Sequence, residues 1–193
     1  MNTSGDPSFG DKGLAALCTG LMSSKSLQSL DLENKDIRSE GAVQLAQVLA
    51  QNRSLQRLNL ARNPLGDAGL ASLAQLPWAC LSNLDLRACG IAADGIASLA
   101  AAAAQGGLGS LSFLDLSHNG LGPDAGTALA MFLRSTPALH ELRLSSCKLG
   151  DDGVQGVSGG LALHPYLHSL NLSDNGCGSV SGCVGWGVNN SYS

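Results

Sequence analysis

The chain has 193 residues, and its 15 acidic and 11 basic side chains give a net charge of −4 at neutral pH. That length is enough for one domain with a hydrophobic core. The mildly acidic balance, without a basic block, argues against a nucleic-acid or anionic-membrane surface, and an aromatic content of 4% argues against a platform on which bases or sugars stack.

Residues 1–26 are expected to form an N-terminal tail followed by the helical half of an incomplete repeat, GDKGLAALCTGLM at 10–22. The tail has neither the charged start nor the apolar run of a secretory signal. We therefore expect an intracellular protein whose six cysteines are reduced thiols. The cytoplasm is the favoured location, and a nuclear or a cytoskeletal, axonemal location is the alternative. No stretch of the sequence is apolar enough over enough residues to span a bilayer.

Six segments of one pattern follow, beginning at residues 27, 55, 81, 111, 139 and 167, with a mean spacing of 28 residues. All six fit L-x-x-L-x-L, and four fit the longer form L-x-x-L-x-L-x-x-N/C-x-L/I. The first departs from it at Lys35 and the last at Cys177. The leucine pattern predicts a short strand in every copy, and one copy needs a neighbouring copy to bury its leucines.

The second half of each repeat carries apolar residues at three- and four-residue spacing, as in AADGIASLAAAA at 92–103, which predicts a helix. Acidic residues are expected to cap the starts of these helices: Asp67, Asp94, Asp124 and Asp151 or Asp152. Strands pair about 4.8 Å apart, whereas helices pack about 8–10 Å apart. A stack of such units must therefore curve into an α/β solenoid, with parallel strands on its concave face and helices on its convex face.

The ninth position of the pattern is Lys35 in the first repeat and then alternates between two residue types: Asn63, Cys89, Asn119, Cys147 and Asn175. An Asn there can hydrogen-bond backbone groups left unpaired where the strand turns toward the helix. A Cys can fill the same place as a small buried group. We expect these five residues to form a structural ladder. Reactive thiols at Cys89 and Cys147 are the alternative, for which no cationic partner is evident.

The repeat region is therefore assigned to residues 27–176. Residues 177–193 are rich in glycine and carry no helix pattern, so an irregular tail is expected there. The incomplete first and last repeats indicate a fragment of a longer array, and a short protein with unusual caps is the alternative.

The repeats over residues 10–176 resemble leucine-rich repeats of the ribonuclease-inhibitor-like class, in which long units carry alternating Asn and Cys at the turn. The resemblance implies a horseshoe arc in an intracellular ligand-binding protein. Three functions remain open. A non-catalytic protein-interaction scaffold is favoured. A GTPase activator of the Ran type would carry an acidic C-terminal segment, which this sequence lacks, and the repeat sensor section of a NOD-like receptor would follow a nucleotide-binding domain.

Partner contacts are expected on the concave face, where the pattern places its third, fifth, seventh and eighth positions. The candidates are the arginines and aromatic side chains at these positions, since such residues dominate interfaces: Arg57, Arg62, Arg87, Phe113, His118 and Arg143. The alternative is a solvated face whose charges pair along the strands, such as Arg87 with Asp85 or Asp115. We expect the partner to be a protein, with no nucleic acid and no membrane.

Two patterns typical of catalytic and phosphate-binding sites, H-E-x-x-H and G-x-x-x-x-G-K-S/T, are missing from the sequence. We therefore expect no enzyme activity and no cofactor. His164 and His168 are four residues apart, but a proline follows the first and a strand pattern contains the second, so no metal site is expected from this pair. His140 and His168 share the second position of adjacent repeats and are expected to lie near each other as exposed side chains.

Overall fold

The computed structural model describes residues 9–76, 78, 80–162 and 164–178. Six helices alternate with six three-residue strands along this part of the chain. In chain order they are α1 (Gly10–Ser23), β1 (Ser29–Asp31), α2 (Ser39–Leu49), β2 (Arg57–Asn59), α3 (Gly66–Ala74), β3 (Asn83–Asp85), α4 (Ala93–Ala104), β4 (Phe113–Asp115), α5 (Ala125–Ser135), β5 (Glu141–Arg143), α6 (Gly150–Leu161) and β6 (Ser169–Asn171). Every predicted strand segment therefore contains a strand.

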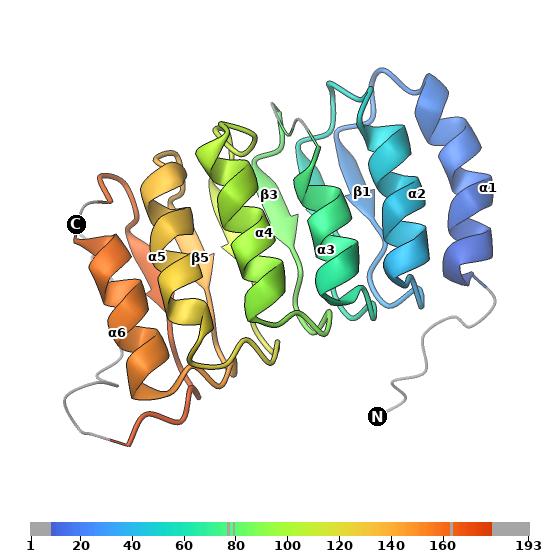
Figure 1. Ribbon diagram of the computed structural model, residues 1–193. Coiled ribbons are helices and arrows are strands. Elements are labelled where there is room, and N and C mark those ends of the chain that lie inside the picture. Colours follow the sequence, from blue (N-terminus) through green and yellow to red (C-terminus); the bar gives the residue numbers. More distant parts are fainter. Residues whose placement is uncertain (1–8, 77, 79, 163, 179–193) are drawn as a thin grey trace, which may run out of the picture.

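The six strands form one open parallel sheet in sequence order. Neighbouring strands pair in register, so the middle leucines lie in a single row: Leu30, Leu58, Leu84, Leu114, Leu142 and Leu170. The helices cover one face of the sheet, and no helix of the described part covers the other face (Figure 1). We call this second face the concave face. The predicted α/β solenoid is confirmed.

The core lies between the sheet and the helices, and each repeat completes the core of its neighbours. The leucines of the row have exposures of 2% or less in β2 to β5, where a repeat lies on both sides. In β6, which has a described repeat on one side, Leu170 is only half buried. A single strand–helix unit therefore lacks the surface needed to bury its own leucines.

The asparagines of the ninth position join the backbones of two repeats. Oδ1 of Asn119 accepts the N–H groups of Cys89 and Ile91 in the preceding repeat, at 2.9 and 3.1 Å. Its Nδ2 donates to the carbonyl oxygens of Leu86 in the preceding repeat and Leu116 in its own, at 2.8 and 2.7 Å. The corresponding contacts are made by the other two asparagines of the ladder, Asn63 and Asn175.

The cysteines of the ninth position make a weaker link. The thiol of Cys89 donates to the carbonyl oxygen of Leu60 at 3.2 Å, and that of Cys147 donates to Leu116 at 3.3 Å. Because a thiol is a weak donor and acceptor, it does not replace the amide oxygen that binds two N–H groups. At this position the repeats are therefore joined firmly in pairs, the first to the second, the third to the fourth and the fifth to the sixth.

The acidic residues at the helix starts do not cap their own helices, and this part of the prediction is wrong. None of the six helices has a side-chain hydrogen bond from its capping residue. Asp67 is already the second residue of α3, whereas a capping residue lies outside the helical conformation. Its Oδ1 instead accepts the N–H of Ala92, directly before α4, at 2.7 Å. Asp11 binds the N–H of Arg38, before α2, in the same way.

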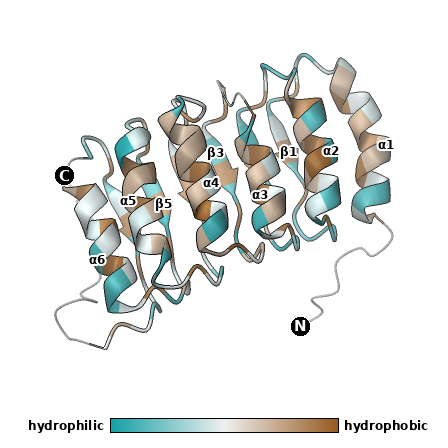
Figure 2. Ribbon diagram, in the orientation of Figure 1, coloured by the Kyte–Doolittle hydropathy of each residue, from teal (hydrophilic) through white to brown (hydrophobic). Residues whose placement is uncertain are grey.

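The acidic residues nevertheless lie where the helix dipole favours negative charge. Hydrophilic residues mark the lower ends of α1, α3, α4 and α6 in Figure 2, and these are the N-terminal ends of the helices. The first turns there contain one or two carboxylates each, from Asp11, Asp67, Asp94, Asp151 and Asp152. Negative charge at this end complements the positive end of the helix dipole. The bonds of Asp11 and Asp67 also join neighbouring repeats.

We expect Asn119→Ala to lower the free energy of unfolding by about 1–3 kcal/mol, because it leaves buried backbone N–H and C=O groups without partners. Cys147→Ala serves as the control from the same position of the next repeat. It removes one weak donor, and the loss should be smaller than for Asn119→Ala. Urea denaturation followed by circular dichroism measures both values, and an equal loss would contradict the role of the amide.

Candidate interaction surface

The concave face carries a network of charged side chains centred on Arg87, the seventh position of the third repeat. Its guanidinium lies 2.7 Å from Asp85, 3.8 Å from Asp115 and 4.0 Å from Glu33. The hydrogen bonds with Asp85 and the negative charge of the three carboxylates raise the pKa of Arg87. Arg62 reaches the same Glu33 at 3.4 Å. The alternative interpretation of the sequence is a solvated face on which Arg87 pairs with Asp85 or Asp115. Arg87 lies close to both of these carboxylates.

Asp115 is buried, although the repeat pattern places its fifth position among the partner-contacting positions of the concave face. Its side chain is only 3% exposed, because Arg87 and Arg143 approach it from the two neighbouring strands at 3.8 and 3.7 Å. Its Oδ1 accepts the N–H of Ser117 at 2.9 Å. A carboxylate buried on this face needs such partners, since an unpaired buried charge is strongly unfavourable. Together with Asp85 and Glu141, which lie closer to the two arginines, Asp115 therefore helps to hold two of the six candidate contact residues.

Arg143 also lies over an aromatic ring. Its guanidinium carbon is 5.1 Å from the centroid of the Phe113 ring, within the range of a cation–π contact. The other side of the guanidinium is held by Glu141 at 2.7 Å. Three of the candidates, Arg87, Phe113 and Arg143, are thus brought together around Asp115.

Arg57 lies at a hollow of about 200 Å³ on the concave face over β1 to β4. The hollow is lined by six residues with polar side chains and three apolar residues: Ser29, Asp31, Arg57, Asn59, Asn83 and Asp85, with Leu30, Leu58 and Phe113. Arg57 is exposed and pairs with no carboxylate of the described residues. It therefore keeps its charge available at the edge of the hollow.

The eighth position has a backbone role that the sequence pattern did not suggest. All six residues there adopt a left-handed conformation, with φ between 52° and 60°: Asn34, Arg62, Ala88, His118, Ser146 and Asp174. The preference of Asn, Asp and His for this conformation is the signal that could have revealed it. His118 is exposed on this turn, and the described contacts do not join its side chain to the other five candidates.

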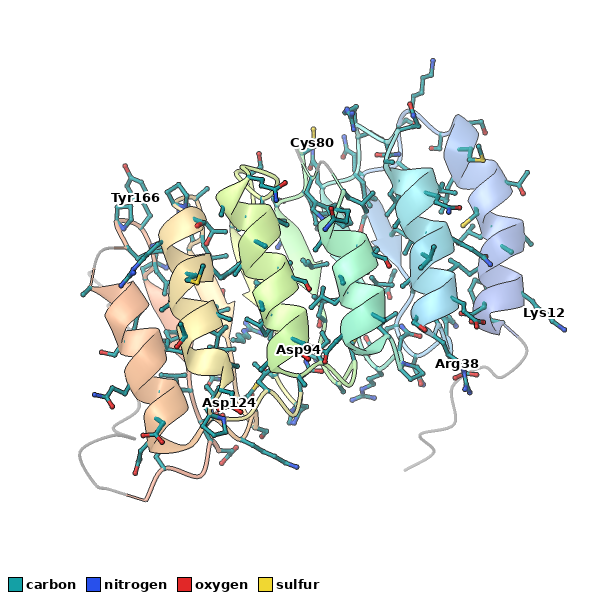
Figure 3. All side chains as sticks on the ribbon, viewed as in Figure 1. Lys12, Arg38, Cys80, Asp94, Asp124 and Tyr166 are labelled. Carbon is teal, nitrogen blue, oxygen red and sulfur yellow. The ribbon has the colours of Figure 1, made fainter. Side chains whose placement is uncertain are left out.

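The cysteines divide into buried and exposed groups. Burial raises the pKa of Cys89 to about 12 and that of Cys147 to about 11, so both stay protonated at neutral pH. Burial also raises the pKa of Cys18. Cys80 is an exposed free thiol in the loop before β3 (Figure 3). These values oppose the alternative of reactive thiols at the ninth position, because the thiolate is the nucleophile.

Cys177 takes part in a disulfide, so the expectation of six reduced cysteines is wrong. That expectation rested on the missing export signal in the N-terminal sequence, which does not determine whether a particular cysteine is bonded to another. The rest of the predicted tail, from residue 179 onward, lies outside the described residues.

Within the described ranges, no three His, Cys, Asp or Glu side chains gather as a metal site. No helix among the same residues is long and apolar enough to cross a membrane.

Comparisons with known proteins agree with the repeat architecture. The model of the family "Leucine Rich repeat" matches residues 51–74, 110–130 and 137–158. Curated proteins give no match. The fold is similar to leiomodin-1 actin-binding site 2 (ABS2), with a TM-score of 0.58 and 17% identity over 78% of this chain and 88% of that chain. A complex of TLR13 with ssRNA13 matches with a TM-score of 0.41 and 18% identity over 86% of this chain and 31% of that chain. At these identities the likeness concerns the fold alone.

We expect Asp115→Asn to lower the free energy of unfolding by about 1–3 kcal/mol, since the variant removes the negative charge between Arg87 and Arg143. Asp31→Asn is the matched control. Asp31 holds the same position in the first repeat and binds the N–H of Glu33 in the same way, but it is exposed. Its change should stay within about 0.5 kcal/mol. Thermal unfolding of the two variants decides the matter, and equal stability would show that Asp115 is not held by its arginines.

Thiol labelling tests the burial of the cysteines. At pH 8, a thiol-specific reagent should label Cys80 rapidly in the native protein, whereas Cys18, Cys89 and Cys147 should react only after urea is added. The thiolate fraction of the two ladder cysteines is on the order of 10⁻³ or less at this pH, and burial blocks the reagent. Mass spectrometry of tryptic peptides identifies the labelled residue. Rapid native labelling of Cys89 would contradict the structure.

Proposed function

We propose that this chain, which is a leucine-rich repeat protein, acts as a non-catalytic scaffold that binds a protein partner on its concave face. A solenoid presents an extended concave surface, and such surfaces commonly bind other proteins. We further propose that the repeats belong to the ribonuclease-inhibitor-like class and that the protein acts inside the cell, in the cytoplasm.

The observation that carries the proposal is the hollow beside Arg57. It combines an exposed arginine that pairs with no carboxylate of the described part of the chain, an aromatic ring at Phe113, and two side-chain amides, Asn59 and Asn83. Arginine and aromatic residues are over-represented among the residues that dominate protein interfaces. Asn59 already donates to Glu33 and accepts the N–H of Ala61, and Oδ1 of Asn83 accepts the hydroxyl of Ser82. The remaining amide N–H groups and lone pairs can bind the backbone of an incoming segment.

The charged network beside the hollow supports specificity. Arg87 and Arg143 are held in place by Asp85, Asp115 and Glu141, so little side-chain freedom is lost when a partner binds them. Fixed charges of both signs favour a partner with the complementary pattern and oppose others. The same pairing means that these two arginines contribute less attraction than Arg57.

The leiomodin-1 structure supplies a first partner to test. That segment is named as an actin-binding site, and its fold is similar to the fold of this chain over most of both lengths. We therefore include actin in the binding test as a named protein, while the proposal of a protein partner does not depend on it.

The test compares two charge- and size-matched double variants. Arg57→Glu with Phe113→Ala alters the hollow, whereas Lys12→Glu with Met131→Ala alters exposed residues of α1 and α5 on the convex face. Proteins captured from cell lysate by wild type are quantified by mass spectrometry, and a captured protein is then purified and its affinity measured directly, alongside filamentous actin.

We expect the concave variant to weaken direct binding at least about tenfold, the effect of losing roughly 1.4 kcal/mol or more. The convex variant should bind as wild type does. Binding that survives the concave variant and is lost in the convex variant would overturn the assignment of the concave face.

A further inference from the structure

Two exposed imidazoles stand side by side at the start of the last two described strands. His140 precedes β5 and His168 precedes β6, and the backbone N–H of His168 donates to the carbonyl oxygen of His140 at 3.0 Å. Their ring centroids are 5.3 Å apart, with 67° between the ring planes. The Tyr166 ring stacks on His140 with a centroid distance of 6.3 Å, and Figure 3 shows Tyr166 projecting outward at this end of the molecule.

The contacts of His140 indicate the tautomer of its neutral ring. Its Nδ1 lies 2.6 Å from the carbonyl oxygen of Ala138. A carbonyl only accepts hydrogen bonds, so Nδ1 carries the proton and Nε2 of the neutral ring keeps its lone pair. Histidines that bind metals in proteins commonly have this arrangement, in which the second ring nitrogen donates to a backbone carbonyl.

The spacing of the two rings suits a shared ion. A zinc–nitrogen bond of about 2.0–2.1 Å places the centroid of an imidazole about 3.2 Å from the metal. At a tetrahedral angle, two such centroids are then about 5.2 Å apart, close to the observed 5.3 Å. We propose that His140 and His168 form a two-ligand site for a divalent transition metal of the zinc class, whose remaining positions are filled by water.

The other two histidines of the chain do not take part. His164 uses both ring nitrogens, since Nε2 contacts the carbonyl oxygen of Thr136 at 2.9 Å and Nδ1 accepts the N–H of Leu167 at 3.0 Å. His118 is exposed on the turn after β4, in another part of the repeat. The chain contains four histidines in all, so the site can be tested against two internal controls.

The site joins the fifth and sixth strands near the end of the described sheet. A ligand that binds the folded state and not the unfolded state stabilises the fold. Zinc binding should therefore raise the melting temperature of the protein in proportion to the logarithm of the free zinc concentration above the dissociation constant. This readout does not depend on any protein partner, and the site does not rest on the proposed scaffold function.

The experiment is a Zn²⁺ titration of the full chain carrying Cys80→Ser, which removes the exposed thiol as a competing ligand. Proton NMR follows the C2–H signals of the four imidazoles, and calorimetry gives the stoichiometry and affinity. We expect one ion per chain, with the His140 and His168 signals moving together and those of His118 and His164 unchanged. His168→Gln should weaken binding about tenfold or more, and His118→Gln should not.

Three outcomes would overturn the proposal. The first is an equal response of all four imidazole signals, which indicates unspecific binding. The second is an affinity of His168→Gln equal to that of its parent. The third is the absence of any shift at His140 and His168 with excess Zn²⁺.

Discussion

The structure depends on how the backbone is satisfied where each strand turns toward its helix. At that point N–H and C=O groups leave the strand ladder inside the core, and burying each of them without a partner would cost about 1–3 kcal/mol. The amide of Asn119 accepts two N–H groups and donates to two carbonyls across two repeats. Because Cys follows in the next repeat, this strong link alternates with a weak one from turn to turn along the solenoid.

The in-register parallel sheet also explains the surface chemistry. In this sheet, residues at the same position of the repeat pattern lie side by side on neighbouring strands. The type of residue at each position therefore decides which side chains contact one another. In the middle of the arc this places Asp115 between Arg87 and Arg143 and neutralises much of the network. Toward the first repeats it leaves Arg57 beside a hollow. Beyond β4 it brings His140 next to His168.

The candidate residues illustrate the limit of pattern reasoning. The period identified all six concave candidates as residues near the strands, and three of them gather around one carboxylate. It did not reveal that Asp115 is buried, because burial depends on the length and direction of two arginine side chains from different strands. His118 shares its repeat with Phe113 but lies on the left-handed turn after the strand, and the described contacts do not join its side chain to the other candidates.

The sequence by itself determined the strands, their register, the helix layer and the ninth-position ladder, because all of these follow from a 28-residue period of leucine and asparagine. The tertiary structure alone decided that Asp67 binds Ala92 of the next repeat, that Asp115 lies beneath two arginines, and that Cys177 is in a disulfide. The first two contacts depend on the distances between atoms of neighbouring repeats. A period specifies which residues become neighbours, and only the packed helices and strands set how far apart their atoms lie.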